Sequence, residues 1–238
     1  MLAAVDFNSP LLWAVFIGWV LSVVLHEFAH GLVAFWGGDY TIRERGGLTL
    51  NPLQYVDPVM SIILPMVIFL MGGIPLPGGV TYIRDDLLRS RAWRSAVSAA
   101  GPLMNFLIFL ACALPFHPTI GWLDVPKIGE TPTTAQTFLG AMATLELFSV
   151  LLNLVPVPPL DGFQMLTPWM KEDSREKLMR PPTSIALFLI FFFVVMRIPH
   201  VIQAFYRVID WIMARLGFDE ACIDFFARSF NLALFGIA

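Results

Sequence analysis

The sequence predicts an all-α membrane protein, a polytopic bundle of transmembrane helices with a small β element and a re-entrant loop. Of its 238 residues, 57% are hydrophobic and only 14% are charged, and the mean hydropathy is +0.73. Several apolar runs approach the roughly 20 residues that a helix needs to cross about 30 Å of hydrocarbon. Because lipid offers no hydrogen bonds to the backbone, such runs are stable there only as helices or closed barrels. The apolar side chains are therefore expected to pack against lipid and against one another.

The first half of the chain predicts one span, a small β element and a bent segment. The first span covers about residues 11–36 and ends at the glycine pair 37–38, a helix-stop signal. In the polar segment that follows, residues 40–50 are predicted to form a strand pair around two glycines. The next apolar run, residues 59–76, is interrupted by proline and glycine and leads into Pro77-Gly78-Gly79. This composition is typical of a bent or re-entrant element.

The second half adds three apolar runs, at residues 96–115, 138–157 and 184–196. The middle run ends in three closely spaced prolines, which break a helix. The tail, residues 200–238, is interpreted as one or two interfacial helices. We expect residues 1–182 to form the functional core, and residues 183–238 to add a C-terminal transmembrane helix and the interfacial tail.

The basic residues indicate the topology, because short cytoplasmic loops carry an excess of Lys and Arg. If residues 59–76 are re-entrant, Arg43 and Arg45 lie on the same side as the basic loops at 84–94 and 171–180, and only Lys127 opposes them. If that run crosses, Arg43 and Arg45 join Lys127. The re-entrant path gives the cleaner distribution. The re-entrant path also places the end of the first helix and the end of the fourth apolar run on the same side of the membrane, the cytoplasmic side.

The charge pattern excludes nucleic acid as a partner. The net charge is -3, and no basic run is interleaved with aromatic residues. The two cysteines, Cys112 and Cys222, lie far apart in apolar surroundings, so neither a disulfide framework nor a paired metal motif is expected. The expected partners are the lipid bilayer and other membrane-embedded chains.

A metal motif lies inside the first span, where His26-Glu27-Phe28-Ala29-His30 has the pattern H-E-x-x-H. Residues four apart share one helical face, so both imidazoles can bind one cation while Glu27 reaches the water on it. Zinc lowers the pKa of such a water to about 7, and an adjacent carboxylate can take its proton as it attacks a peptide carbonyl. The motif therefore predicts Zn²⁺, with His26 and His30 as ligands and Glu27 as the catalytic carboxylate.

The membrane setting strengthens this interpretation. Each ionisable side chain near the bilayer centre costs on the order of 2.5–3.5 kcal/mol, so three of them need partners, and a metal ion is the obvious one. The alternative is a buried polar cluster that joins helices.

A catalytic zinc usually takes a third protein ligand and leaves a fourth position for water. Asp161 is the best candidate, because it follows a proline-broken helix end and precedes Gly162, which lets the chain turn back into the bundle. As an alternative, Asp161 would cap the short helix that begins near Gly162. From its position alone the two roles are equally supported.

The sequence resembles the site-2 protease family, whose members cut substrates within or near the membrane. Three segments carry the resemblance, in the family's order and spacing over about residues 21–166: His26-Glu27-Phe28-Ala29-His30, Ala100-Gly101-Pro102-Leu103-Met104-Asn105, and Asn153-Leu154-Val155-Pro156 running into Leu160-Asp161-Gly162. Together they are specific, whereas the middle one alone is a weak signal. The sequence departs from the usual pattern at residues 75–82, so substrate entry is expected to differ.

The resemblance implies that Asp161 is the third zinc ligand, that Glu27 is the general base, and that Asn105 and Asn153 lie near the substrate. The two amides would bind the scissile carbonyl or the substrate strand. Alternatively, they form interhelical hydrogen bonds of about 0.6 kcal/mol each.

Glu146 is a further intramembrane carboxylate, for which protonation and bonding to a neighbour is the favoured role. The resemblance also implies a compact form without a PDZ domain, in a prokaryotic plasma membrane with its site facing the cytoplasm.

The expected function is intramembrane proteolysis, in which zinc-activated water cleaves a transmembrane protein or peptide. A helical substrate must unwind before a carbonyl can reach the metal, and a β edge at residues 40–50 is expected to hold the unwound strand. One alternative is a non-proteolytic membrane scaffold or transporter with a structural metal site. Another is a different membrane zincin, such as a prenyl-protein processing protease, with Glu or His as its third ligand.

Overall fold

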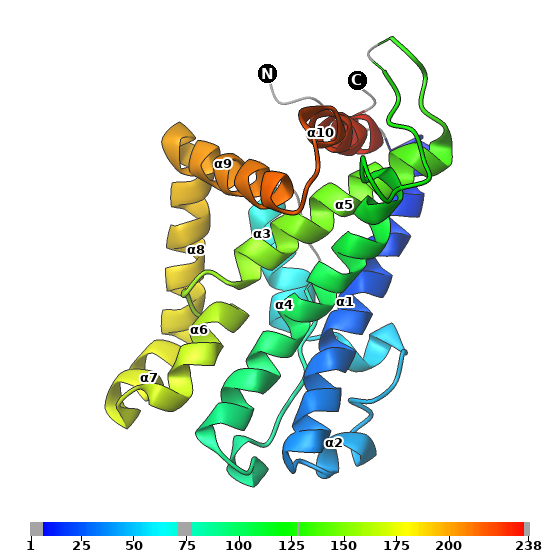
Figure 1. Ribbon diagram of the computed structural model, residues 1–238. Coiled ribbons are helices and arrows are strands. Elements are labelled where there is room, and N and C mark those ends of the chain that lie inside the picture. The colour runs from blue at the N-terminus through cyan, green and yellow to red at the C-terminus, as the bar shows by residue number, and fades with distance from the viewer. Residues whose placement is uncertain (1–6, 71–77, 128, 236–238) are drawn as a thin grey trace. The chain divides into compact units, whose positions relative to one another are not determined.

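The structure, a computed structural model, describes residues 7–70, 78–127 and 129–235 (Figure 1). Helices dominate these residues, and none of them forms a strand. The longer helices are α1 (Pro10–Gly37), α4 (Arg91–Ala113), α5 (Thr134–Asn153), α8 (Pro181–Arg197), α9 (Pro199–Arg215) and α10 (Glu220–Phe235). The shorter ones are α2 (Thr41–Glu44), α3 (Leu64–Leu70), α6 (Asp161–Leu166) and α7 (Glu172–Met179).

Within the described residues, three helices are long and apolar enough to cross a membrane. They are α1, α4 with its 3-10 extension to Phe116, and α5. A fourth span exists if α7 and α8, which meet at a bend of 70°, are taken together. The helical class and the membrane character predicted from the sequence are thus confirmed.

The predicted strand pair at residues 40–50 is wrong. This segment forms α2 and a turn at Gly46, whose φ of +79° suits glycine. The turn closes around Ile42, which is buried and whose carbonyl accepts a hydrogen bond from the Gly47 N–H at 2.9 Å. The backbone groups that a strand would expose are used locally, so the predicted docking edge for a substrate is absent here.

The apolar run at residues 59–76 begins with a π-helical turn, Pro58–Ile63, capped by the Asp57 carboxylate, and continues as α3. Residues 71–77 lie outside the described residues. The described helix, Pro58–Val67, is shorter than the three candidate spans. The re-entrant path therefore stays a prediction.

The chain divides into two compact units. The first contains Met1–Trp19, Asn105–Ser149 and Gln203–Ala238, and the second contains Val20–Met104 and Val150–Ile202. The first unit holds a large aromatic core that includes Phe109, Phe116 and Phe225, with both cysteines buried as free thiols. The second has smaller apolar clusters, one around Phe188 and Phe192 and one around Ala34 and Val97. Every residue of the H-E-x-x-H motif and Asp161 belong to the second unit.

Candidate metal centre

The helix α1 presents the two histidines of the motif from adjacent turns. An uninterrupted apolar sequence without proline favours a continuous helix here, and residues four apart then share a face. His26 and His30 are both buried, and their Nε2 atoms lie 3.1 Å apart. Both nitrogens therefore point at one place beside the helix.

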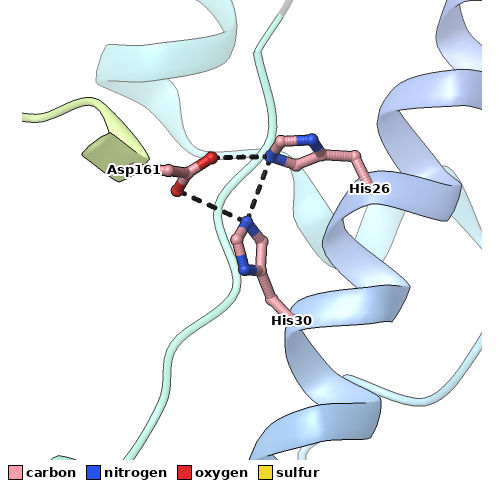
Figure 2. A group of neighbouring side chains, drawn as sticks. All are labelled: His26, His30 and Asp161. Carbon is pink, nitrogen blue, oxygen red and sulfur yellow. Dashed lines mark hydrogen bonds and ion pairs between the residues drawn. The ribbon is translucent and has the colours of Figure 1, made fainter. Parts of the chain in front are cut away.

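Asp161 comes to the same place from the first residue of α6 (Figure 2). The N-cap of that helix is Leu160, without a side-chain cap, so the Asp161 carboxylate is not used as the N-cap. The turn that precedes it packs closely: a side chain at Gly162 would overlap the carbonyls of Leu154 and Val155. The carboxylate oxygens lie 3.1 Å from His26 Nε2 and 3.4 Å from His30 Nε2.

These three side chains have the spacing that a tetrahedral zinc site needs. One ligand atom from each of His26, His30 and Asp161 can be chosen so that all lie within 4.8 Å of one another. Zinc bonds of about 2.0–2.1 Å in a tetrahedron place neighbouring ligand atoms about 3.3 Å apart. The observed separations of 3.1, 3.1 and 3.4 Å match this value. A buried imidazole pair and carboxylate is also the donor set that zinc prefers.

A hydrogen bond from α4 orients one of the imidazoles. His30 Nδ1 lies 2.6 Å from the carbonyl oxygen of Val97. A carbonyl only accepts, so Nδ1 carries a hydrogen, and in the neutral ring the lone pair of Nε2 is directed toward Asp161. Metal-binding histidines commonly make such a bond, which fixes both the tautomer and the ring.

One turn further along α4, Gly101 lies against the same two imidazoles. A Cβ at this position would overlap the Nε2 atoms of both His26 and His30. The helix backbone therefore forms a wall of the site, and only glycine leaves the space open. The sequence marks Gly101 only as part of a weak motif, and nothing in the local pattern indicates this contact.

Glu27 is buried next to the first histidine and is covered by residues 78–84, which form neither helix nor strand. A Cβ at Gly79 would lie 2.7 Å from Glu27 Cγ, and the Thr81 hydroxyl donates to the Glu27 carbonyl at 3.1 Å. Burial raises the pKa of Tyr55, and the negative charge of Glu27 raises it further, although a hydrogen bond at Thr49 lowers it.

The backbone of the 78–84 segment bonds to the rest of the second unit at alternate residues. Its bonds to the rest of the second unit use the Gly78 carbonyl, the Val80 N–H, the Tyr82 carbonyl and the Arg84 N–H. Alternate residues bond in this way in an extended chain. Within the described part of the chain, the backbone groups of the intervening residues Gly79, Thr81 and Ile83 have no hydrogen-bond partner.

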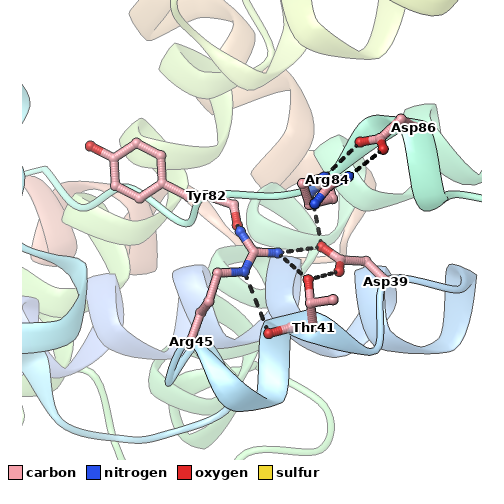
Figure 3. Close-up of polar contacts among 6 residues, drawn as sticks. All are labelled: Asp39, Thr41, Arg45, Tyr82, Arg84 and Asp86. Carbon is pink, nitrogen blue, oxygen red and sulfur yellow. Dashed lines mark hydrogen bonds and ion pairs between the residues drawn. The ribbon is translucent and has the colours of Figure 1, made fainter.

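A buried carboxylate just beyond α1 fixes the far end of this segment (Figure 3). Asp39 accepts hydrogen bonds from the Thr41 hydroxyl, from Arg45 at 2.8 Å and from the Arg84 N–H at 2.9 Å. Burial raises the pKa of Asp39, but these bonds and the Arg45 charge outweigh burial and hold that pKa below its ordinary value. Neither the composition nor the periodicity of this part of the chain indicates the role of Asp39.

Asp39→Asn is expected to lower the free energy of unfolding by about 2 kcal/mol at pH 7, because a charged acceptor of several hydrogen bonds is lost. Since the folded-state pKa is lowered, this contribution is complete above pH 4 and disappears as pH falls through the folded-state value. Thermal unfolding in detergent at several pH values measures both effects. Asp86→Asn, which removes an exposed ion pair with Arg84, is the control and should change little. Equal stability of Asp39→Asn and wild type would contradict the anchor.

The remaining predicted residues are less closely tied to the metal centre. Asn153 ends α5 in the second unit, is half-buried, and its amide bonds to no described residue. Asn105 and Glu146 are both buried in the first unit. The roles of all three stay predictions.

A membrane chain in which an H-E-x-x-H pair and a distant aspartate meet at one buried point has the fold and site of a membrane metalloprotease. Residues 116–197 match the family model described as peptidase family M50. The chain is also 33% identical over 220 residues to "Putative zinc metalloprotease Rip2" of Mycobacterium tuberculosis strain H37Rv, covering 88% of this chain and 78% of the relative. The chain therefore belongs to peptidase family M50, the site-2 proteases, and is an intramembrane zinc metalloprotease.

Two further relatives carry similar names. "Putative zinc metalloprotease Rip2" of Mycolicibacterium smegmatis is 36% identical over 182 residues, which cover 74% of this chain and 66% of the relative. "Putative zinc metalloprotease YwhC" of Bacillus subtilis is 28% identical over 164 residues, which cover 67% of this chain and 70% of the relative. No solved structure matches the chain.

Proposed function

We propose that this protease cleaves peptide bonds of membrane-spanning proteins at a zinc ion held by His26, His30 and Asp161, with Glu27 as the general base. The observation that carries the proposal is the convergence of two imidazoles and one carboxylate with separations of 3.1–3.4 Å. When bound, zinc supplies Lewis acidity that activates water and polarises the scissile carbonyl. Glu27 would accept the proton of the attacking water and return it to the leaving amine.

The 78–84 segment supports a peptide as the substrate. An unwound transmembrane segment must satisfy its backbone hydrogen bonds when it leaves its helix. The backbone groups of Gly79, Thr81 and Ile83, which bond to no described residue, lie on the segment that covers Glu27. A substrate strand added there would satisfy the backbone hydrogen bonds of both chains. The half-buried amide of Asn153, which bonds to no described residue, supports a further contact to the substrate backbone, and Asn105 is proposed for a similar role.

The proposed setting is a multi-pass protein of a prokaryotic plasma membrane. The site would face the cytoplasm, since the basic residues fall on one side when residues 59–76 re-enter. Residues 1–182 would form the protease core, with residues 183–238 adding a membrane helix and the interfacial helices α9 and α10. The exposed aromatic side chains of α9, Tyr206 and Trp211, suit a membrane interface.

Cleavage of a transmembrane reporter by the purified protein in liposomes tests the proposal. The expected result is that a zinc chelator stops cleavage and that added Zn²⁺ restores it, with about one zinc per chain by elemental analysis. Asp161→Ala should lose zinc, whereas Glu146→Ala, a change in the other compact unit, should keep it. Full zinc content in Asp161→Ala, or cleavage that persists without metal, would contradict the proposed site.

A further inference from the structure

The second unit contains a polar cavity of about 490 Å³ that the proposed chemistry does not use. This volume lies in the range of ligand-binding pockets. The cavity is lined by α4, by α6 with the turn that follows it, by α7 with Arg180 just after it, and by Asp85 in the 3-10 turn Asp85–Leu87. Nine of its ten lining residues are polar or charged, Met179 being the exception. Its occupant must therefore be polar.

The cavity and the metal centre draw residues from the same two helices, α4 and α6. Ser98, which lines it, directly follows Val97, whose carbonyl accepts the hydrogen bond from His30. Gln164, on the opposite wall, lies one helical turn after Asp161 in α6. Each wall therefore contains a residue within one helical turn of the metal centre. Ser98 is next to Val97, and Gln164 is three residues after Asp161.

The two walls are fixed to each other beside the cavity. The Ser95 hydroxyl donates to the Met165 carbonyl at 2.7 Å, and the Trp169 indole N–H donates to the Ser95 oxygen at 3.0 Å. Gln164 is held by its own bond to the Pro159 carbonyl at 2.8 Å. The distance between the cavity and the metal centre is therefore set by the fold.

Among the described residues, one cation that lines the cavity has a buried nitrogen without a hydrogen-bond acceptor. Arg175 and Arg180 pair with Glu172 and Glu176 at 3.5 and 2.7 Å. By contrast, the Nε atom of Arg94 is buried, and no described residue accepts its hydrogen. The pKa of Asp86 is lowered chiefly by its hydrogen bond with Arg84, and only weakly by the charge of Arg94. A buried donor without an acceptor is costly, so an acceptor from outside the chain is indicated.

We infer that this cavity binds the polar flank of the substrate, and that Arg94 binds an acidic side chain in that flank. The inference rests on the proposed proteolytic function. Arg94 precedes Gly101 by seven residues in α4, or about 10 Å along the helix. An extended peptide covers this distance in about three residues. A guanidinium presents paired donors that fit a carboxylate, so the site selects Asp or Glu near the third residue from the scissile bond.

Reporters that differ at one flank position test this specificity. A transmembrane reporter is made with Asp, Asn or Lys at the second, third or fourth residue from the cut, on the side of its polar flank. Wild-type protein is expected to cut the best Asp reporter roughly tenfold more efficiently, by kcat/KM, than its Asn counterpart. Arg94→Gln should remove this preference, and Arg94→Glu should favour Lys. Arg91→Gln, an exposed arginine of the same helix outside the cavity, is the matched control.

Two further measurements separate the subsite from the protease function. Zinc content should be unchanged in every Arg94 variant, and the zinc-loaded Glu27→Gln protein should bind the Asp reporter about tenfold more tightly than the Asn reporter. Cleavage that depends on Glu27 but not on the flank charge, or a wild-type preference for Lys, would overturn the subsite alone. Absence of any cleavage by zinc-loaded wild type would overturn the proposed function and the subsite with it.

Discussion

Replacing Glu27 by Gln is expected to lower the rate of peptide-bond cleavage by roughly 10²–10⁴-fold, the usual contribution of a general base. Gln has nearly the same size, so the packing of Gly79 against this side chain should survive. What is lost is the ability to accept a proton from the attacking water. Because Glu27 is not one of the three proposed zinc ligands, the zinc content of the variant should stay at the wild-type level. Reporter cleavage and elemental analysis on the same preparation measure both properties.

The control is the same substitution at the other buried membrane carboxylate. Glu146 belongs to the first unit, whereas the residues of the metal centre belong to the second, and Glu146→Gln should leave cleavage within a fewfold of wild type. Normal cleavage by Glu27→Gln would rule out its assigned role. A scaffold that holds only a structural metal would be indifferent to both changes, so this pair of variants also distinguishes an enzyme from a scaffold.

Gly101→Ala is expected to reduce zinc affinity by about 10–100-fold, a loss comparable to removal of a supporting group around a metal. The added methyl group would overlap the Nε2 atoms of His26 and His30, which are the proposed zinc ligands. Either the imidazoles rotate away or α4 moves, and both outcomes separate the ligands. Alanine is the better helix former by about 1 kcal/mol, so a weakened helix cannot explain the loss. Zinc titration of the metal-free protein, with circular dichroism for helix content, measures the effect.

Gly18→Ala is the matched control, since Gly18 is also a glycine inside a membrane helix. The nearest atoms to its added methyl are the ends of two side chains, Met142 Sδ at 3.0 Å and the Phe138 ring at 3.2 Å, and no metal ligand is among them. This variant should bind zinc like wild type, whereas Asp161→Ala should fail to bind it. If Gly101→Ala holds zinc as tightly as Gly18→Ala, the backbone of α4 does not limit the site as described.

The long helices are predictable from this sequence because their apolar runs are continuous. The first run was expected at residues 11–36 and forms α1 at Pro10–Gly37. The fourth run was expected to continue to residue 157, but α5 ends at Asn153, since Pro156 disfavours helix in the residue before it and cannot donate a helical hydrogen bond. The strand pair at residues 40–50 failed because short-range bonds around Ile42 outweigh the strand and turn pattern of that segment.

The metal centre is predictable only in part. The two histidines can be found because their spacing of four is a local helical rule. Asp161 reaches them through a chain reversal that depends on the close packing of Gly162 against Leu154, and the sequence alone left its capping role open. Gly101 and Gly79 act through contacts with residues more than 50 positions away. Neither helical nor strand periodicity contains information about such contacts.

The Asp161 carboxylate and the His30 imidazole meet although they lie 131 positions apart in the sequence. An ion bound to both side chains links two distant parts of the chain. Closing so long a loop costs conformational entropy, and the free energy of metal binding offsets part of that cost because the site forms only in the folded state. Metal uptake then contributes to folding as well as to catalysis. In a cell starved of zinc, newly made protein would lack the metal link to Asp161 and would be less stable near the proline-rich turn that precedes this residue. It would therefore be degraded sooner by quality-control proteases.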